Sequence, residues 1–238
     1  CALFGLPASG RAQVYAALCR QLDKPLCIVT PGEAEATRFA ADLNTLGIPA
    51  AVFPARDYVL RPIEGTAREY EYRRLAVLGE LVGGRLRAVA VPAEALTQFT
   101  TPKEDFCANT RTLHAGDTLL RDDLLAALFG AGYTRRAQVD GPGQFSVRGD
   151  IVDIFAPDQK MPVRMEFWGD EIDTLHTFDL TTQRREDAID KFYLSPAREV
   201  LFGKPADAAE QLRAFLAKQR GKKKTAMADC MAADLDLL

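Results

Sequence analysis

The loop from Gly5 to Gly10 (GLPASG) is the first place where residue types and spacing could do chemistry. Two glycines with four residues between them, leading into a helix, are typical of a P-loop, whose backbone N–H groups bind phosphate. A working P-loop continues with Lys for the β- and γ-phosphates and Ser or Thr for Mg²⁺, whereas this chain has Arg11 and Ala12. Alanine has no oxygen for magnesium, and arginine is not equivalent to the compact lysine ammonium. We therefore expect a degenerate loop that forms a tight turn and does not hydrolyse ATP.

Other catalytic or metal-binding chemistry has few candidates. The five cysteines contain no CxxC pair, and only two histidines are available as ligands or acid–base groups. Acidic pairs such as Glu33/Glu35 fall at expected helix starts, where carboxylates interact favourably with the helix dipole. We expect no catalytic residue, no metal and no cofactor in this chain, and reduced cysteines in a reducing cytoplasm.

A second group of residues points to binding. In the segment VRMEFWGDEIDTLHTFD (residues 163–179), apolar residues alternate with Arg164, Glu166 and Trp168. This alternation predicts a strand with one core face and one solvent face. A solvent face that carries Trp beside Arg has the composition of an interface centre. The alternative is that Trp168 covers a neighbouring helix and Arg164 only neutralises Glu166.

The turn of the same segment predicts a hairpin. Gly169-Asp170 is a typical two-residue turn, and residues 171–178 would return as the partner strand. This register places Thr174 on the core face and Asp173 directly opposite Glu166. Because like charges in opposite positions are unfavourable, an arginine should lie nearby or come from a partner.

Further arginines occur upstream, at Arg135, Arg136 and Arg148. Arg148 belongs to an RGD triplet of the integrin-ligand type. Such triplets are common by chance, and this one falls in an expected strand turn, so we discount that interpretation.

Regular elements must position these residues. Helical spacing and apolar runs predict helices over residues 11–22, 33–46 and 69–82, and strands over residues 25–30, 51–54 and 87–92. Strands that alternate with helices predict right-handed crossovers and a parallel sheet covered on both faces. The fold class expected for this part is α/β.

The pattern changes near residue 110. A helix is expected over residues 122–129, and residues 133–194 form short β-rich runs separated by glycine turns, which indicates an inserted α+β, mainly antiparallel domain. Helical character returns over residues 206–218, before a lysine run at 222–224 that is typical of a solvated surface. The expected domains are residues 1–110, an insertion at 111–195, and a return segment at 196–238 that completes the first domain.

The composition is that of an ordinary globular protein. Hydrophobic residues make up 47% of the 238, and no apolar run is long enough to span a membrane. The net charge of −3 argues against a DNA-coating surface. Because the chain starts at Cys1 without a leader, we expect an internal piece of a longer cytoplasmic protein.

Two strings in the insertion resemble a known family. GQFSVRGDIVDIF (residues 143–155) and VRMEFWGDEID (163–173), continued by FDLTTQR (178–184), are similar to the second domain shared by UvrB and the bacterial transcription-repair coupling factors (Mfd). The loop at residues 5–10, FPARDY (53–58) and VAVPAEAL (89–96) look like the first domain of that module. The similarity covers roughly residues 5–200.

Two departures favour the coupling-factor branch. UvrB keeps an intact P-loop, whereas this chain has Arg11-Ala12. UvrB also inserts a long aromatic hairpin that clamps damaged DNA, whereas only residues 59–65 follow FPARDY before the next helix. The resemblance implies a degenerate helicase-like platform that has lost ATP and hairpin chemistry but still binds the repair protein UvrA.

The resemblance also implies site residues. The basic and aromatic residues that contact UvrA in the family fall on Arg135, Arg148, Arg164 and Trp168, with Arg136 as an alternative to Arg135 and Trp168 where relatives usually have Phe. The longer protein would be an ATP-dependent translocase on double-stranded DNA that displaces stalled RNA polymerase, and would bind ATP and Mg²⁺ elsewhere. We also expect the longer protein to mask this surface, because an exposed patch of Arg and Trp would otherwise recruit repair proteins constantly. Two alternatives are a UvrB-type excision helicase that binds nucleotide and damaged DNA here, and an unrelated α/β nucleotide-binding enzyme.

Overall fold

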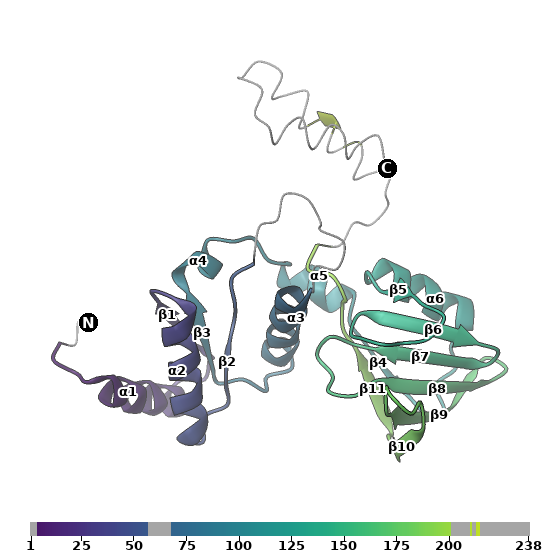
Figure 1. The fold of residues 1–238 in the computed structure, drawn as a ribbon, viewed down its shortest axis with the longest axis horizontal. Coiled ribbons are helices and arrows are strands. Elements are labelled where there is room, and N and C mark those ends of the chain that lie inside the picture. The colour runs from purple at the N-terminus through teal and green to yellow at the C-terminus, as the bar shows by residue number, and fades with distance from the viewer. Residues whose placement is uncertain (1–3, 57–67, 201–209, 211–212, 215–238) are drawn as a thin grey trace. The chain divides into compact units, whose positions relative to one another are not determined.

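A three-stranded parallel sheet forms the first part of the chain. Its strands, in the order β1-β3-β2, are β1 (Leu26–Thr30), β3 (Ala88–Pro92) and β2 (Ala50–Val52) (Figure 1). In this computed structural model, residues 4–56, 68–200, 210, 213 and 214 are described. The predicted parallel sheet is confirmed. Four predicted features lie outside the described residues: the short segment 59–65, most of the helix expected over 206–218, the lysine run 222–224, and most of the return segment 196–238.

Three helices pack on this sheet. Helices α1 (Ala8–Gln21) and α2 (Glu33–Thr45) share one apolar cluster with β1, and α3 (Glu69–Val82) shares another with β3. Each was predicted, and α3 has the predicted bounds. The central strand β3 is buried throughout, as expected.

The prediction that both sheet faces are covered is wrong for β1 within the described part of the chain. Val29 is 54% exposed and Cys27 is also exposed. Their register partners on β3, Val89 and Val91, belong to the cluster on the α3 side. The cover of that face therefore stops at β3, because α3 reaches β3 but not the neighbouring edge strand.

The second part is built around a six-stranded sheet in the order β10-β9-β8-β7-β6-β5 (Figure 1). The strands are β5 (Thr134–Arg135), β6 (Gln144–Arg148), β7 (Ile151–Phe155), β8 (Val163–Trp168), β9 (Glu171–Phe178) and β10 (Arg185–Ala188). All neighbours are antiparallel except β5 and β6, which are parallel. The described structure is thus mixed, with one parallel and one mainly antiparallel sheet, as predicted.

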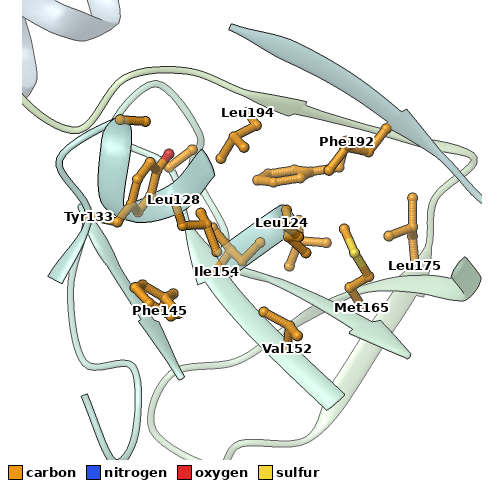
Figure 2. Close-up of a cluster of buried hydrophobic side chains, with 14 of the residues drawn as sticks. Leu124, Leu128, Tyr133, Phe145, Val152, Ile154, Met165, Leu175, Phe192 and Leu194 are labelled. Carbon is orange, nitrogen blue, oxygen red and sulfur yellow. The ribbon is translucent and has the colours of Figure 1, made fainter. Parts of the chain in front are cut away.

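Helix α6 (Arg121–Gly130) covers one face of this larger sheet. Figure 2 shows its Leu124 and Leu128 among core side chains of the sheet, including Phe145 and Met165. A two-stranded antiparallel sheet, β4 (Arg111–His114) with β11 (Lys191–Leu194), adds Phe192 to the same core. Alternate residues of β6, β7 and β8 supply the core, so the intervening residues form a second face, which is mainly polar but also carries the buried Phe155.

Two short helices were not predicted, α4 (Ala93–Leu96) and α5 (Lys103–Ala108). They are too short for helical periodicity to identify. None of the helices in the described residues is long and apolar enough to cross a membrane. The domain boundaries at residues 110 and 195 stay predictions.

Asp158 lies where the insertion contacts α3. Its Oδ1 accepts a 2.6 Å hydrogen bond from Ser195 Oγ, and its Oδ2 is buried without a hydrogen-bond partner. A Cβ added at Gly79 of α3 would lie 3.2 Å from that Oδ2, so a larger residue at this position would require the Asp158 side chain to shift by a few tenths of an ångström. Burial raises the pKa of Asp158, and the Ser195 hydrogen bond opposes the rise only in part.

We predict a pH-dependent effect of Asp158→Asn on stability. Because the folded-state pKa of Asp158 is raised, the folded protein binds this proton more tightly than the unfolded chain, and wild-type stability falls as pH rises through that pKa. The variant lacks this titration, so its free energy of unfolding should improve relative to wild type as pH increases. Urea unfolding between about pH 3 and pH 7 measures the trend.

The control is Asp179→Asn. Hydrogen bonds from the backbone and side chain of Thr182 lower the pKa of Asp179, so this carboxylate stabilises the fold above its unfolded pKa and loses that effect as pH falls. Relative to wild type, Asp179→Asn should therefore lose stability as pH increases. Identical trends for the two variants would contradict the assignment of a buried, raised carboxyl to Asp158.

Candidate protein-interaction face

The β8–β9 hairpin forms as predicted at its turn. Trp168 pairs with Glu171 across Gly169-Asp170, and Gly169 has φ +64°, a conformation that favours glycine. The predicted register beyond the turn is wrong. Glu166 lies opposite Thr174, because the pairing shifts between Glu166 and Phe167.

This register shift changes which side chains share a face. Ile172 pairs with Phe167 and is fully buried, whereas Thr174, predicted on the core face, lies on the polar face beside Glu166. Asp173 is the extra residue of the irregularity and is exposed. The predicted contact between Glu166 and Asp173 therefore does not form.

The polar face of the six-stranded sheet carries a row of arginines and carboxylates, which we call the arginine face. Its members are Arg148 on β6, Asp153 on β7, Arg164, Glu166 and Trp168 on β8, and Arg185 on β10. Asp153 on β7 is in register with Arg164 on β8. Two residues further along the same pair of strands, Ile151 is in register with Glu166. Paired residues point to the same side of a sheet, so these groups lie together on the side away from α6.

Asp153 forms hydrogen bonds with two of the arginines. Its buried carboxylate accepts hydrogen bonds from Arg164 Nε at 2.7 Å and Nη2 at 3.0 Å, which is a bidentate contact. Arg148 Nη2 donates to the same carboxylate at 2.7 Å. The Arg164 guanidinium also stacks on the Phe178 ring, 4.7 Å from its centroid. The hydrogen bond to Asp153 raises the pKa of Arg164, with attraction from Asp153 and Glu166 acting in the same direction against desolvation.

The predicted solvent exposure of this face is right for Trp168 and wrong for Arg164. Trp168 is 82% exposed, so it does not cover a neighbouring helix in the described part of the chain. Arg164 is only 8% exposed, because Phe178 and the carbonyl of Gln183 cover it. About half of the Arg148 side chain, 47%, remains exposed.

The arginine expected near Glu166 is Arg185. It forms an ion pair with Glu166 Oε1, while Thr174 Oγ1 donates to Oε2 at 3.4 Å. Arg185 was not predicted as a site residue. The signal available was its place in the charged run QRRED, directly after the hairpin.

The structure does not bring Arg135 to the arginine face. Arg135 on β5 is in register with Phe145, a core residue, so its exposed side chain lies on the α6 side of the sheet edge. Thr134 is in register with Gln144, which shares the face of Arg148. Arg136 follows the end of β5, and its backbone N–H donates to the Phe145 carbonyl at 2.8 Å.

The degenerate loop leads into α1. Gly5 has φ +79°, and α1 begins at Ala8, earlier than predicted. Arg11 Nη1 lies 3.5 Å from Glu35 Oε1, and the Ala12 methyl is buried in the cluster shared with α2. Arg11 thus has a carboxylate neighbour, and Ala12 contributes to packing. That this loop lacks ATP chemistry stays a prediction.

Comparison with known proteins agrees with the architecture of the insertion. A protein-family model described as the UvrB interaction domain matches residues 112–200, which include every residue of the arginine face. The part of the chain that carries the arginine face is thus similar to the UvrB interaction domain.

Most of the chain is similar to transcription-repair-coupling factors. It is 35% identical to that of Myxococcus xanthus over 208 residues, which are 83% of this chain and 17% of that protein. It is 38% identical to that of Mycobacterium bovis over 192 residues, which are 77% of this chain and 15% of that protein. UvrABC system protein B of Chlorobium limicola is 28% identical over 226 residues, 89% of this chain and 32% of that protein. The chain thus spans about one sixth of the coupling factors it matches.

Proposed function

We propose that this chain is a UvrA-recruiting module of a transcription-repair coupling factor, and that UvrA binds the arginine face of its UvrB interaction domain. The observation that carries the proposal is that the arginine face presents an exposed Trp168 together with the half-exposed Arg148, which is hydrogen-bonded to Asp153. An aromatic anchor beside an arginine is typical of interface centres. The module has no catalytic role of its own.

The longer protein would supply the remaining activities. A translocase that moves on double-stranded DNA and displaces stalled RNA polymerase would bind ATP and Mg²⁺ outside this chain. The Arg11-Ala12 pair supports this division, since the loop lacks the lysine and the magnesium ligand of a working P-loop. The recruiting module would bring UvrA to the site where the polymerase has stalled.

The arginines of this face have different roles in the proposal. Arg148 would contact UvrA directly, because half of its side chain is exposed. Arg164 would act mainly by fixing Asp153, since its guanidinium is largely covered by Phe178. Arg135 would contribute from the sheet edge only if UvrA wraps around β5, and Arg136 stays the alternative to it.

The first test is the affinity of the chain for purified UvrA. Wild type is expected to bind, and Arg148→Ala is expected to bind about tenfold more weakly, which corresponds to ~1.4 kcal/mol for one half-exposed charged contact. The defect should shrink as salt is raised, because the contact is electrostatic. Calorimetric titration at two salt concentrations measures both effects.

Arg111→Ala is the matched control, because Arg111 is an exposed arginine on β4, in the separate two-stranded sheet. It should leave the affinity unchanged. Wild type that fails to bind UvrA would overturn the proposal. Titration of wild type with ATP and with damaged duplex DNA tests the UvrB-type alternative, which predicts binding of both.

A further inference from the structure

The charges of the arginine face form one continuous ladder of alternating sign. In order across the sheet it comprises Arg148, Asp153, Arg164, Glu166 and Arg185. Asp153 bridges the first two arginines, Glu166 attracts Arg164 from the same strand, and Arg185 forms an ion pair with Glu166. Three guanidinium groups and two carboxylates leave the ladder with one net positive charge.

The two ends of the ladder are built alike. Arg148 is 47% exposed over a carboxylate that is 1% exposed, and Arg185 is 48% exposed over a carboxylate that is 21% exposed. In each case the arginine is anchored through Nη2, and the negative charge lies beneath it. A guanidinium has five N–H donors, so an anchored arginine still has donors for a second acceptor. A partner approaching this face therefore meets positive charge at both ends.

We propose that Arg185 is a further contact residue of this interface, and that the bound UvrA surface presents carboxylates at both ends of the ladder. This inference rests on the proposed function. β6 and β10 are separated by four strand spacings, about 19 Å between backbones. An interface of standard size, roughly 800 Å² on each partner, easily spans that width. Trp168 projects from β8, between the two ends, where an anchor residue is expected.

The ion pair between Arg185 and Glu166 contributes little to the stability of the fold. All four residues of β10 are exposed, and a half-exposed ion pair contributes only about 0–1 kcal/mol to stability. Arginine suits this position for binding because its planar fork can hold Glu166 and a partner carboxylate together. The neighbouring Arg184 is also exposed, but it is not part of the ladder.

The test compares UvrA binding by wild type, Arg185→Ala, Glu166→Gln and the double variant Arg185→Ala/Glu166→Gln. Arg185→Ala is expected to weaken binding about tenfold, or ~1.4 kcal/mol. The double variant should remain as weak as Arg185→Ala, because the lost contact is with UvrA. Arg185→Lys, which keeps the charge without the fork, should recover only part of the affinity.

The double variant separates a direct contact from a structural one. If Arg185 served only to neutralise Glu166, removal of both charges would restore wild-type affinity, and that result would overturn the inference. Unchanged affinity of Arg185→Ala would overturn it as well, while leaving the proposed function in place. Failure of wild type itself to bind UvrA would overturn both. Thermal unfolding of each variant shows whether the fold is retained.

Discussion

Glu199→Ala is expected to lower the free energy of unfolding by about 3–5 kcal/mol, because it leaves the guanidinium of Arg74 charged and buried without its partner. Both side chains are fully buried. Glu199 accepts hydrogen bonds from Arg74 Nη2 at 2.7 Å and Nε at 2.9 Å. Arg74 on α3 also donates to the Pro54 carbonyl at 2.8 Å and lies 4.0 Å from the Phe53 ring centroid. Little water can replace the lost carboxylate.

The position of the Arg74–Glu199 pair explains why its loss should destabilise both parts of the fold. Glu199 follows the last strand of the insertion, and its backbone N–H donates to Glu71 of α3. Its carbonyl accepts a hydrogen bond from Thr101, which precedes the insertion. The pair therefore ties α3 to the two places where the chain enters and leaves the second domain.

Urea unfolding measures the Glu199→Ala effect, with Glu104→Ala as the control, since Glu104 is an exposed glutamate in the first turn of α5. The control should change stability by no more than about 0.5 kcal/mol. The double variant Arg74→Met/Glu199→Leu should regain much of the loss, because it removes both buried charges. A loss below ~1 kcal/mol for Glu199→Ala would contradict the buried-charge argument.

The regular elements of the first part could be predicted because their signals are local. Leu75, Leu78 and Val82 lie at helical spacing, and α3 has the predicted bounds. The strands β1 and β3 are short apolar runs, and their parallel pairing follows from the helices between them. By contrast, the exposed face of β1 depends on how far α3 extends across the sheet, which no local pattern encodes.

The arginine face could be predicted in part. Strict alternation placed Trp168 and Arg164 on one face, and that placement holds. Alternation does not show what covers a face, and Arg164 is buried because Phe178 and the turn after β9 fold over it. The irregularity near Glu166 also has no signature in the sequence, although it decides that Thr174 and not Asp173 lies opposite Glu166.

The buried and long-range ion pairs could not be predicted from the sequence. Arg74 sits in a helix among other charged residues, and its partner Glu199 is 125 positions away. Arg185 and Glu166 are 19 positions apart in the sequence. They come into contact because β9 pairs with both of their strands, β10 and β8. Such contacts follow from the tertiary arrangement and not from periodicity. The role of the degenerate loop rests on sequence alone and is tested by the nucleotide titration.

Trp168→Ala is expected to have the largest effect of any single change on UvrA binding. Hot-spot tryptophans typically cost about 2 kcal/mol or more on truncation, which is roughly a 30-fold loss of affinity. The side chain is 82% exposed in the free chain, so the apolar surface that UvrA would bury is not used for folding. The free energy of unfolding should therefore change by no more than about 0.5 kcal/mol. Calorimetric titration and urea unfolding of the same protein separate the two quantities.

Two matched variants make this prediction specific. Trp168→Phe keeps an aromatic ring and should lose much less affinity, since a smaller ring can still bury apolar surface against UvrA. Phe99→Ala removes a side chain that is 93% exposed but lies outside residues 112–200, and this variant should bind UvrA as wild type does. Affinity of Trp168→Ala within twofold of wild type would show that the arginines bind UvrA without an aromatic anchor. Equal losses in Trp168→Ala and Phe99→Ala would show that exposed aromatic surface, and not this face, drives the association.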